Sequence, residues 1–413
     1  MTAAGCGGKG QECEARLLDT QHLWYGDNRA RLDDFMAQHG TCPGDETMPV
    51  AIVDFDHTSI TGNLGGAMLF DLLMTDGMHQ PNTWADTSKY LSAEALLSLA
   101  AYCPLGTWPD PLPTSTSDDC LTAIVCLYTK GAVWNGVQSR GTPADLCTGA
   151  PAWDLPDDAA DRMSPAQAWA LSLYKGYTPS MIGNAAREAF ERRVEAPEDM
   201  SGSVGYLDGV DAPIRVHEPI RELVSALQDN GFDVWISTEH SRQAVAALAP
   251  GVLGVAADHV IGTELSLDPA AGTALYGFQG CGGYPDNTQD IMSYRRGKRC
   301  YINKIIAGIS DGDAQLSQPS PTSFAAGSSD SDIFMVDDAT DLRLVLNLNQ
   351  PEIMCHAYAN DDGNWLINPL FNTPLPRLEA GYDCQPHGIP DQTDTVFCVG
   401  GAYSRGTCSA PLN

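Results

Sequence analysis

Apolar and polar residues alternate along the chain in an order that predicts an α/β fold. Residues 50–55 read Val-Ala-Ile-Val-Asp-Phe, a short β-branched apolar run that ends in acids. Such a run suits a strand that is buried on both faces of a parallel sheet. A helical pattern over 218–227 and a break at Asn230-Gly231 precede a second apolar run over 232–236. Strand, helix and strand in this order predict an α/β unit.

Polar residues stand where the predicted strands end. The first run ends in Asp54 and the second runs into Ser237 and Thr238, and we expect two further strands at 323–326 and 343–347. Open α/β sheets bind their ligands beyond the carboxyl ends of the strands. The sequence therefore predicts a ligand site at this edge of the sheet.

The first two strands are too far apart in the chain for a single crossover connection. The intervening residues are rich in Trp, Pro and Cys, and we interpret them as an inserted domain. The predicted segments are a flexible N-terminal tether (1–13), the first part of the core (14–61), an inserted cap (62–213), the second part of the core (214–372) and a Cys-containing tail (373–413).

The net charge disfavours binding to nucleic acid. The chain carries 23 Lys and Arg against 53 Asp and Glu, a formal charge of -30. A surface this acidic repels nucleic acid and anionic membranes. No apolar run reaches the roughly 18 residues that a membrane-spanning helix needs, so we expect no transmembrane segment.

The cysteine content indicates an oxidising compartment. Thirteen cysteines occur without a paired CxxC zinc pattern, which favours disulfides and a secreted, periplasmic or cell-envelope protein. Ala4-Gly5-Cys6 and the following glycines resemble the cleavage site of a bacterial lipoprotein signal, which predicts a lipid anchor on Cys6. The apolar stretch that should precede such a site is missing, and a flexible terminus without lipid is the alternative.

Asp54-Phe55-Asp56-His57-Thr58 is the central chemical feature. Two acids one residue apart can divide a phosphoryl transfer, because one attacks phosphorus while the other handles the proton of the leaving group. An anion attacking a phosphate dianion needs a cation nearby, and Mg²⁺ suits oxygen ligands.

This motif resembles the first motif of the haloacid dehalogenase (HAD) superfamily, in which DxDxT follows a core strand. The resemblance implies a Rossmann-like core with a parallel sheet and an inserted, mainly helical cap. It does not explain the Cys-rich part of that cap, which is expected from the cysteines of the inserted segment. The resemblance also implies that Asp54 is the nucleophile, that Asp56 is the general acid and base, and that Thr58 contributes to substrate binding. An Asp at the second position is similar to the phosphatase branch. His57 stands where Gly or Asn is usual, and we expect an exposed histidine in a turn.

The second and third motifs of the family have candidates in the right order. The second is a Ser or Thr that ends the next core strand, and Thr238 fits it, with Ser237 as the alternative. The third is a Lys that neutralises the nucleophile and the phosphate. Lys298 in Arg-Gly-Lys resembles the entry of the phosphoserine- and phosphorylcholine-phosphatase-like group, and Lys304 is the second choice.

The fourth motif, which supplies further acids for the metal, departs from the family pattern. Residues 327–332 read Gly-Ser-Ser-Asp-Ser-Asp, so that Ser328 takes the place of the first acid while Asp332 keeps the second. The resemblance implies Mg²⁺ bound by Asp54, Asp56, Asp332 and Ser328. Either Asp332 or Asp330 compensates for the serine, or metal binding is impaired. A competing registration uses Asp337, Asp338 and Asp341.

These motifs predict a Mg²⁺-dependent phosphomonoesterase that acts on a small phosphate ester. The cap carries aromatic residues and acids, the ingredients of a quaternary-ammonium cage, which favours phosphocholine or an amino-alcohol phosphate. The alternative for these aromatic side chains is a role in the core of the cap. They are Trp84, Tyr90, Trp108, Trp134, Trp153 and Trp169. A catalytically impaired phosphate-binding scaffold and a phosphotransferase are the competing functions, and the oligomeric state is left open.

Overall fold

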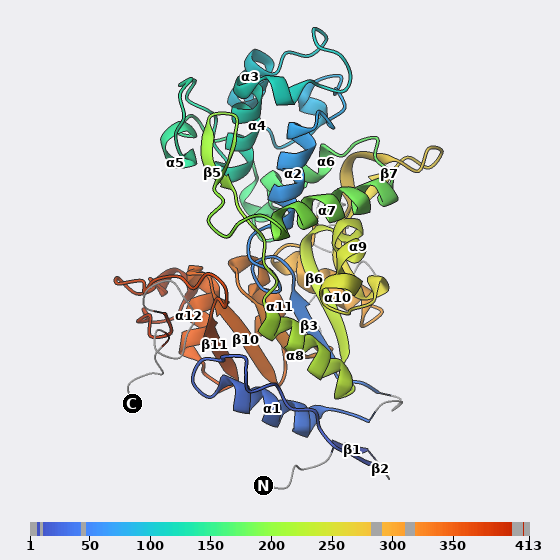
Figure 1. Cartoon of the computed structure of the whole chain (residues 1–413), viewed down its shortest axis with the longest axis vertical. Coiled ribbons are helices and arrows are strands. Elements are labelled where there is room, and N and C mark those ends of the chain that lie inside the picture. The colour runs from blue at the N-terminus through green and yellow to red at the C-terminus, as the bar shows by residue number, and fades with distance from the viewer. Residues whose placement is uncertain are drawn as a thin grey trace.

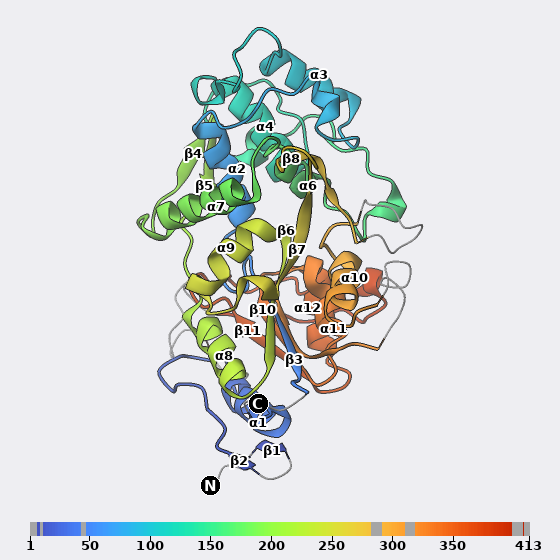
Figure 2. The ribbon, with the colours of Figure 1, turned by 90° about the vertical axis from the view of Figure 1, so that its right-hand side faces the viewer.

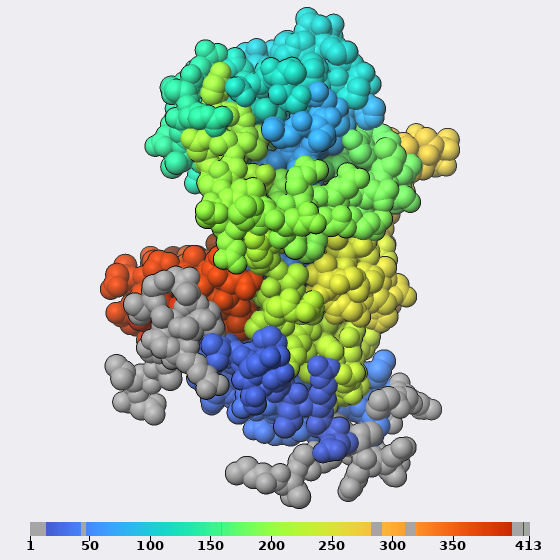
Figure 3. Space-filling model, viewed as in Figure 1, coloured from blue at the N-terminus to red at the C-terminus, as the bar shows by residue number. Residues whose placement is uncertain are grey.

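The computed structural model describes residues 6–8, 11–42, 47–281, 291–309, 319–398 and 408. The molecule has a lower part built on a sheet and an upper part built mainly of helices (Figure 1). The space-filling view shows that its surface narrows between the two parts (Figure 3).

A seven-stranded sheet forms the lower part, in the order β11-β10-β9-β3-β6-β7-β8. All neighbouring strands are parallel except β7 and β8, which are antiparallel. The predicted α/β core with a parallel sheet is therefore confirmed. Its strands are β3 (Val50–Asp54), β6 (Asp233–Ser241), β7 (Val260–Leu267), β8 (Ala274–Gln279), β9 (Thr322–Gly327), β10 (Leu342–Asn347) and β11 (Trp365–Pro369).

Two apolar layers cover the faces of this sheet. Val53 of β3 packs in one layer with apolar residues of α1 (Asn28–His39), α8 (Glu218–Asp229) and α9 (Arg242–Val252). Ile52 packs in the other layer with α10 (Arg296–Ile305), α11 (Ile333–Asp337) and α12 (Pro351–Ala359). Successive strand residues point to opposite faces, so Ile52 and Asp54 share the α10 face.

The upper part is inserted between β3 and β6. It contains α2 (Leu64–Met74), α3 (Ala93–Tyr102), α4 (Asp118–Lys130), α5 (Pro143–Leu146), α6 (Pro165–Ser172) and α7 (Pro179–Val194), with the β4 (Gly202–Val204) and β5 (Leu207–Asp211) ribbon. The expected inserted, mainly helical and Cys-rich unit is thus present, and we call it the cap.

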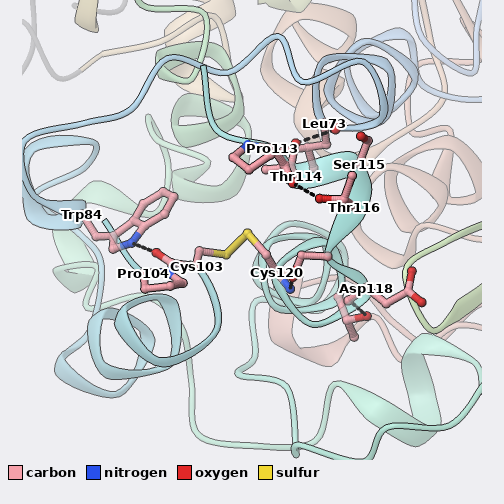
Figure 4. The surroundings of a disulfide bond; sticks show 12 residues. Leu73, Trp84, Cys103, Pro104, Pro113, Thr114, Ser115, Thr116, Asp118 and Cys120 are labelled. Atoms are coloured by element: carbon pink, nitrogen blue, oxygen red, sulfur yellow. Dashed lines mark hydrogen bonds between the residues drawn. A yellow bond between two sulfur atoms is a disulfide. The ribbon is translucent and has the colours of Figure 1, made fainter. Parts of the chain in front are cut away.

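Two disulfides cross-link the cap. Cys103 at the end of α3 is bonded to Cys120 in α4, and Cys126 is bonded to Cys147. Figure 4 shows the first of these, with the indole of Trp84 donating to the carbonyl of Cys103. Because the bonded cysteines are 17 and 21 residues apart, each link closes a short loop.

The lower part has its own disulfides. Cys281 is bonded to Cys300 in α10, Cys355 in α12 to Cys384, and Cys398 to Cys408. The predicted disulfides are therefore present among the described residues. Cys42 is also disulfide-bonded.

Core elements also reach up to the cap. The β7 and β8 ribbon rises alongside α6 (Figure 2), and the Gly176 amide donates to the Ala274 carbonyl at 2.8 Å. Helix α7 of the cap packs on α9 of the core. The cap therefore rests on the core through more than its two connecting segments.

Several further features bear on the sequence predictions. Strand β6 continues to Ser241, beyond the predicted end at Thr238. Near the N-terminus, β1 (Cys6–Gly8) pairs with β2 (Gln11–Cys13), while residues 1–5 and the side chain of Cys6 lie outside what is described. Residues 399–407 and 409–413 of the predicted tail and 310–318 of the polar loop before β9 also lie outside the described residues. No described helix is both long and apolar enough to cross a membrane.

Candidate active site

The two acids of the central motif leave β3 at the carboxyl edge of the sheet. Asp54 is the last residue of the strand and is 5% exposed, and Asp56 is 8% exposed. Asp56 Oδ1 accepts a hydrogen bond from the Leu64 amide, in the first turn of α2, at 2.6 Å. The amides at a helix N-terminus favour a carboxylate, so this contact fixes the position of Asp56.

Lys298 joins Asp54 to Asp332. The lysine is fully buried, and its Nζ lies 2.6 Å from Asp54 Oδ1 and 2.5 Å from Asp332 Oδ1. It is carried by α10, whereas Asp332 follows β9. Residues from three distant parts of the sequence thus form one ion cluster. Lys304, the second candidate, is not part of it, because its Nζ donates to the Cys281 carbonyl at 3.3 Å.

Negative charge exceeds positive charge in this cluster. Burial, followed by the neighbouring Asp332, raises the pKa of Asp54 well above its ordinary value, although Lys298 acts in the opposite direction. Burial alone would lower the pKa of Lys298, but the surrounding acids outweigh it and raise that pKa. The cluster favours an additional cation, because a second positive charge would offset the acids that Lys298 leaves uncompensated.

Of the two placements of the fourth motif, the one at 327–332 lies beside Asp54. Asp332 Oδ2 accepts from the amides of Ser328 and Ser329 at 2.9 and 3.0 Å, which holds the loop after β9 against the carboxylate. The Thr58 hydroxyl donates to the Ser328 hydroxyl at 3.0 Å, and both residues are fully buried. Asp330 has a different role, because it accepts from the Ile353 amide at 3.0 Å.

The competing registration lies away from Asp54. Asp338 forms an ion pair with Arg299 at 2.6 Å, and Asp341 accepts from the Ser323 hydroxyl at 2.5 Å. Asp337 lies 3.6 Å from the ring of His356, and its side chain is 47% exposed. None of these contacts involves a residue of the ion cluster.

Both hydroxyl candidates on β6 lie near the acids. The Thr238 hydroxyl accepts from the His240 amide at 3.1 Å and lies 3.5 Å from Asp56 Oδ2. Ser237 pairs in register with Asp54, and its fully buried Oγ has no hydrogen-bond partner among the described residues. A buried hydroxyl without a partner is unfavourable, so Ser237 has a hydrogen bond to offer a ligand.

His57 differs from the exposed turn histidine that was expected. It has a positive φ of 61° and is partly buried, and its amide donates to the Gly62 carbonyl at 3.1 Å. Burial lowers the pKa of its imidazole, while Asp56 and Asp332 oppose this change. The side chain lines a cavity of about 250 Å³ together with Asn63 and Tyr128, among others.

Sequence reasoning missed Glu239. Burial raises the pKa of its carboxyl to about 7; Lys298 opposes this rise, whereas Asp56 and Asp332 add to it. Glu239 therefore lies within electrostatic reach of the ion cluster. The polar composition of β6 beyond Thr238 conceals this residue, because nothing local distinguishes it from a solvated loop acid.

A hydrogen-bonded hub beside Glu239 was also missed. Asn63 Oδ1 lies 2.8 Å from the Gly66 amide, 3.1 Å from the Tyr128 hydroxyl and 3.2 Å from His240 Nε2. His240 is in turn packed against Gly65, where an added Cβ would lie 1.3 Å from its Cε1. The hub joins β6 of the core to α2 and α4 of the cap. Its one sequence signal is the Asn that precedes the start of α2.

A hard cation fits the chemistry of these donors. Asp54 and Asp332 supply carboxylate oxygens, and Ser328 and Thr58 supply hydroxyls. Within the described ranges, no three His, Cys, Asp or Glu side chains gather as a metal-binding group. Mg²⁺ often binds through one or two carboxylates and keeps several waters, so two acids suffice.

The tryptophans of the cap are mainly core residues. Trp84, Trp134 and Trp169 are at most 4% exposed, and the indole of Trp169 donates to the Thr87 hydroxyl at 2.8 Å. Trp108 and Trp153 pack against the same core, and Tyr90 packs against a separate small cluster. These contacts explain the tryptophans without a quaternary-ammonium cage.

Comparisons with known proteins establish a fold and nothing finer. No protein-family model and no curated protein matches the chain. A conserved protein of unknown function from Anaerococcus prevotii is 17% identical with a TM-score of 0.58, over 89% of this chain and 94% of that one. At this identity, the likeness shows a shared fold alone.

Two other solved structures align less well. A protein of unknown function from Bordetella pertussis is 16% identical with a TM-score of 0.43, over 79% of this chain and 100% of that one. A phosphoserine phosphohydrolase-like protein from Francisella tularensis is 12% identical with a TM-score of 0.32, over 73% and 88%. Scores this low do not establish a shared fold.

Proposed function

We propose that the chain is a Mg²⁺-dependent phosphomonoesterase of the HAD superfamily that forms an aspartyl-phosphate on Asp54. The observation that carries the proposal is the buried cluster in which Lys298 contacts Asp54 and Asp332, with Asp56 two residues from the nucleophile. A buried lysine held between two acids at the end of a parallel sheet has little structural advantage over apolar packing. It does suit a site that must accept a phosphate dianion.

Each residue has a distinct role in the proposed reaction. An Asp54 oxygen attacks phosphorus while the bond from phosphorus to the leaving oxygen breaks, and Asp56 gives its proton to that oxygen. Asp56 then takes a proton from water, the water oxygen bonds to phosphorus, and the bond to Asp54 breaks, which releases phosphate and restores both acids. The Leu64 amide and the Thr238 hydroxyl hold Asp56 for these steps.

Lys298 and the Ser237 hydroxyl of β6 would bind the phosphoryl group and offset its charge. The ammonium group offsets charge on Asp54, and the unpartnered Ser237 hydroxyl supplies a donor to a phosphoryl oxygen. A bound Mg²⁺, held by Asp54, Asp332 and Ser328 with Asp56 nearby, would supply further charge neutralisation. Only two acids, Asp54 and Asp332, contact Lys298 among the described residues, since Ser328 stands where a third acid is expected. We therefore expect weaker Mg²⁺ binding than a site with three acids would give.

The substrate we propose is a small phosphate ester, and an amino-alcohol phosphate such as phosphocholine is the finer candidate. Its support is the position of Glu239, which follows Thr238 in β6 and so brings a further carboxyl close to Asp56. The disulfides further support a secreted or periplasmic location, with lipid attachment at Cys6 as an additional proposal.

The first test is hydrolysis of p-nitrophenyl phosphate and phosphocholine by the wild type, Asp54→Asn and Asp338→Asn. Asp338 is the matched control, because it has the same side chain but belongs to the competing registration and is 47% exposed. We expect Mg²⁺-dependent release that EDTA abolishes, that falls about 10³-fold or more in Asp54→Asn, and that persists in Asp338→Asn.

Ser328 favours one competing function, a phosphate-binding scaffold without turnover. The same proteins separate the two, because a scaffold would bind phosphate in calorimetry and release no product from either ester. Restoring the acid by Ser328→Asp would then be expected to raise Mg²⁺ affinity. A phosphotransferase shares every proposed role, and it would yield a new phosphate ester when an alcohol acceptor is added.

A further inference from the structure

Arg295 occupies a strained backbone position at the start of α10. Its φ is 49° and its ψ is -119°, a conformation that favours glycine and is strained for a residue with a Cβ. The side chain is only 14% exposed. An arginine kept at such a position must gain enough from its contacts to offset the strain.

Those contacts converge on the loop that carries Asp332. The Arg295 amide donates to the Ser331 carbonyl at 2.9 Å, and its Nη1 donates to the Asp330 carbonyl at 3.1 Å. The guanidinium also forms a two-pronged pair with Glu352, in the first turn of α12, at 2.7 and 3.1 Å. Arg295 therefore holds the main chain immediately before Asp332.

The same residue is tied to the helix that carries Lys298. The Lys298 amide donates to the Arg295 carbonyl at 3.0 Å, within the first turn of α10. Lys298 and Asp332 are the two side chains whose contact completes the ion cluster, at 2.5 Å. One residue thus sets the main-chain position of both.

The remaining contact of Arg295 leads to the cap. Its Nε donates to Asp161 Oδ1 at 2.9 Å, and Asp161 lies in the cap segment just before α6. Figure 2 shows this green-cyan part of the cap running down toward α10. The Arg296 amide donates to the Asp161 carbonyl at 3.0 Å, so the cap segment is also held by main-chain contacts.

We propose that Arg295 is a positioning residue that couples the seating of the cap, through Asp161, to the alignment of Lys298 with Asp332. With Asp161 in place, the guanidinium is held between the cap, Glu352 and the loop before Asp332. When the cap segment moves away, Arg295 loses one of its anionic partners, and the strained turn and the loop relax together. The inference rests on the proposed function for its catalytic consequence, but not for its structural one.

The chain offers a matched control in Arg296. Its Nε lies 3.2 Å from Asp161 Oδ2, and its guanidinium lies over the Phe334 ring at 4.3 Å. It is 53% exposed. Arg296 therefore shares the cap partner of Arg295, but among the described residues its guanidinium makes no hydrogen bond to the main chain before Asp332.

The discriminating variant is Arg295→Gly, because glycine relieves the backbone strain while it removes every side-chain contact. For the full-length protein, we expect a lower thermal midpoint, because Glu352 loses its partner. At a temperature where the variant is fully folded, we expect a kcat about tenfold lower on p-nitrophenyl phosphate, with KM changed by less than about threefold. Asp161→Asn should change kcat in the same direction by a smaller factor, and Arg296→Gln should behave as the wild type.

Hydrogen exchange supplies a readout that does not depend on turnover. In Arg295→Gly and Asp161→Asn, peptides that cover 296–300 and 328–333 should exchange faster, and in Arg296→Gln they should not. Unchanged exchange in both variants would overturn the inference, whatever the activity. If the wild type releases no phosphate while exchange changes as expected, the proposed function fails and the coupling stands. If kcat falls only in proportion to the fraction unfolded, Arg295 is merely structural.

Discussion

Removal of the charge of Lys298 should destabilise the protein strongly. In Lys298→Met, the ammonium disappears while most of the volume of the buried stem is kept, so the cavity term is small. Asp54 and Asp332 then remain buried next to each other without the cation that lies 2.6 and 2.5 Å from them. Breaking a buried ion pair by removing one partner costs about 3–5 kcal/mol, and we expect a loss in this range at neutral pH.

The loss should depend on pH with a definite sign. Burial and Asp332 raise the folded-state pKa of Asp54 above its ordinary value of 3.8, and without Lys298 this pKa rises further. An acid with a raised folded-state pKa causes no penalty below its unfolded value, because both states are protonated there. The penalty grows as the pH rises from 3.8 toward the folded-state pKa. The difference between Lys298→Met and the wild type should therefore shrink in acid.

The assay is urea unfolding in EDTA at several pH values, with Lys304→Met as the control. Lys304 lies on the same helix and donates to the Cys281 carbonyl, so its loss should cost about 1 kcal/mol. The double variant Lys298→Met with Asp332→Asn should regain part of the lost stability, since one buried charge is gone. A loss that is the same at every pH would refute the electrostatic reasoning and point to packing instead.

Three further outcomes are expected. Gly65→Ala should lower the thermal midpoint sharply, because the added Cβ would lie 1.3 Å from His240 Cε1. In the control Gly66→Ala, the nearest atom to the added Cβ lies 3.4 Å away, so the midpoint should change little. Equal midpoints for the two variants would contradict this. Burial raises the pKa of Glu239 from 4.5 to about 7, so ionising this carboxyl lowers the stability of the folded state as the pH rises through that window. Glu239→Gln should therefore make the thermal midpoint depend less on pH between 4.5 and about 7. An unchanged slope would count against the raised pKa. His217 is fully buried, and its Nδ1 lies 2.9 Å from the Thr58 carbonyl oxygen. Burial lowers its pKa from 6.5 to about 4, so the neutral imidazole causes no loss of stability above pH 6.5 but an increasing loss as the pH falls toward 4. The stability of His217→Gln, followed by circular dichroism, should therefore fall less between pH 6.5 and about 4 than that of the wild type, and an identical acid transition would contradict this.

The sequence was sufficient to locate the candidate site residues that come directly after a strand. An apolar β-branched run that ends in Asp54 has few alternatives to a buried parallel strand, and it was observed as β3. The order of the motifs also directed attention to Lys298 and Asp332, which the fold brings together. Their roles in catalysis stay predictions. A regular apolar pattern therefore located the acids, because burial of strands leaves a signal in the sequence.

The sequence was insufficient where proximity is created by the tertiary fold. Glu239 lies in a polar stretch that reads as a loop, yet it belongs to β6 because the neighbouring β7 pairs with Ser241. Arg295 has no local signal either, since its partners come from the cap and from α12. Disulfide pairing was unreadable for the same reason, because it depends on which loops meet.

The order of synthesis has a consequence for the sheet. β3 and β6 are neighbours at its centre, but residues 55–232 are translated between them. At roughly 5–20 residues per second, the apolar residues of β3 remain unpaired for on the order of ten seconds or more before β6 is synthesised. The cap is translated during that interval, and its two short disulfide loops can close before any residue of β6 is made. A delay in closing the loop between Cys103 and Cys120 would therefore lengthen the exposure of β3, and the defect would be seen as aggregation of the nascent chain before any loss of activity in the protein that does fold.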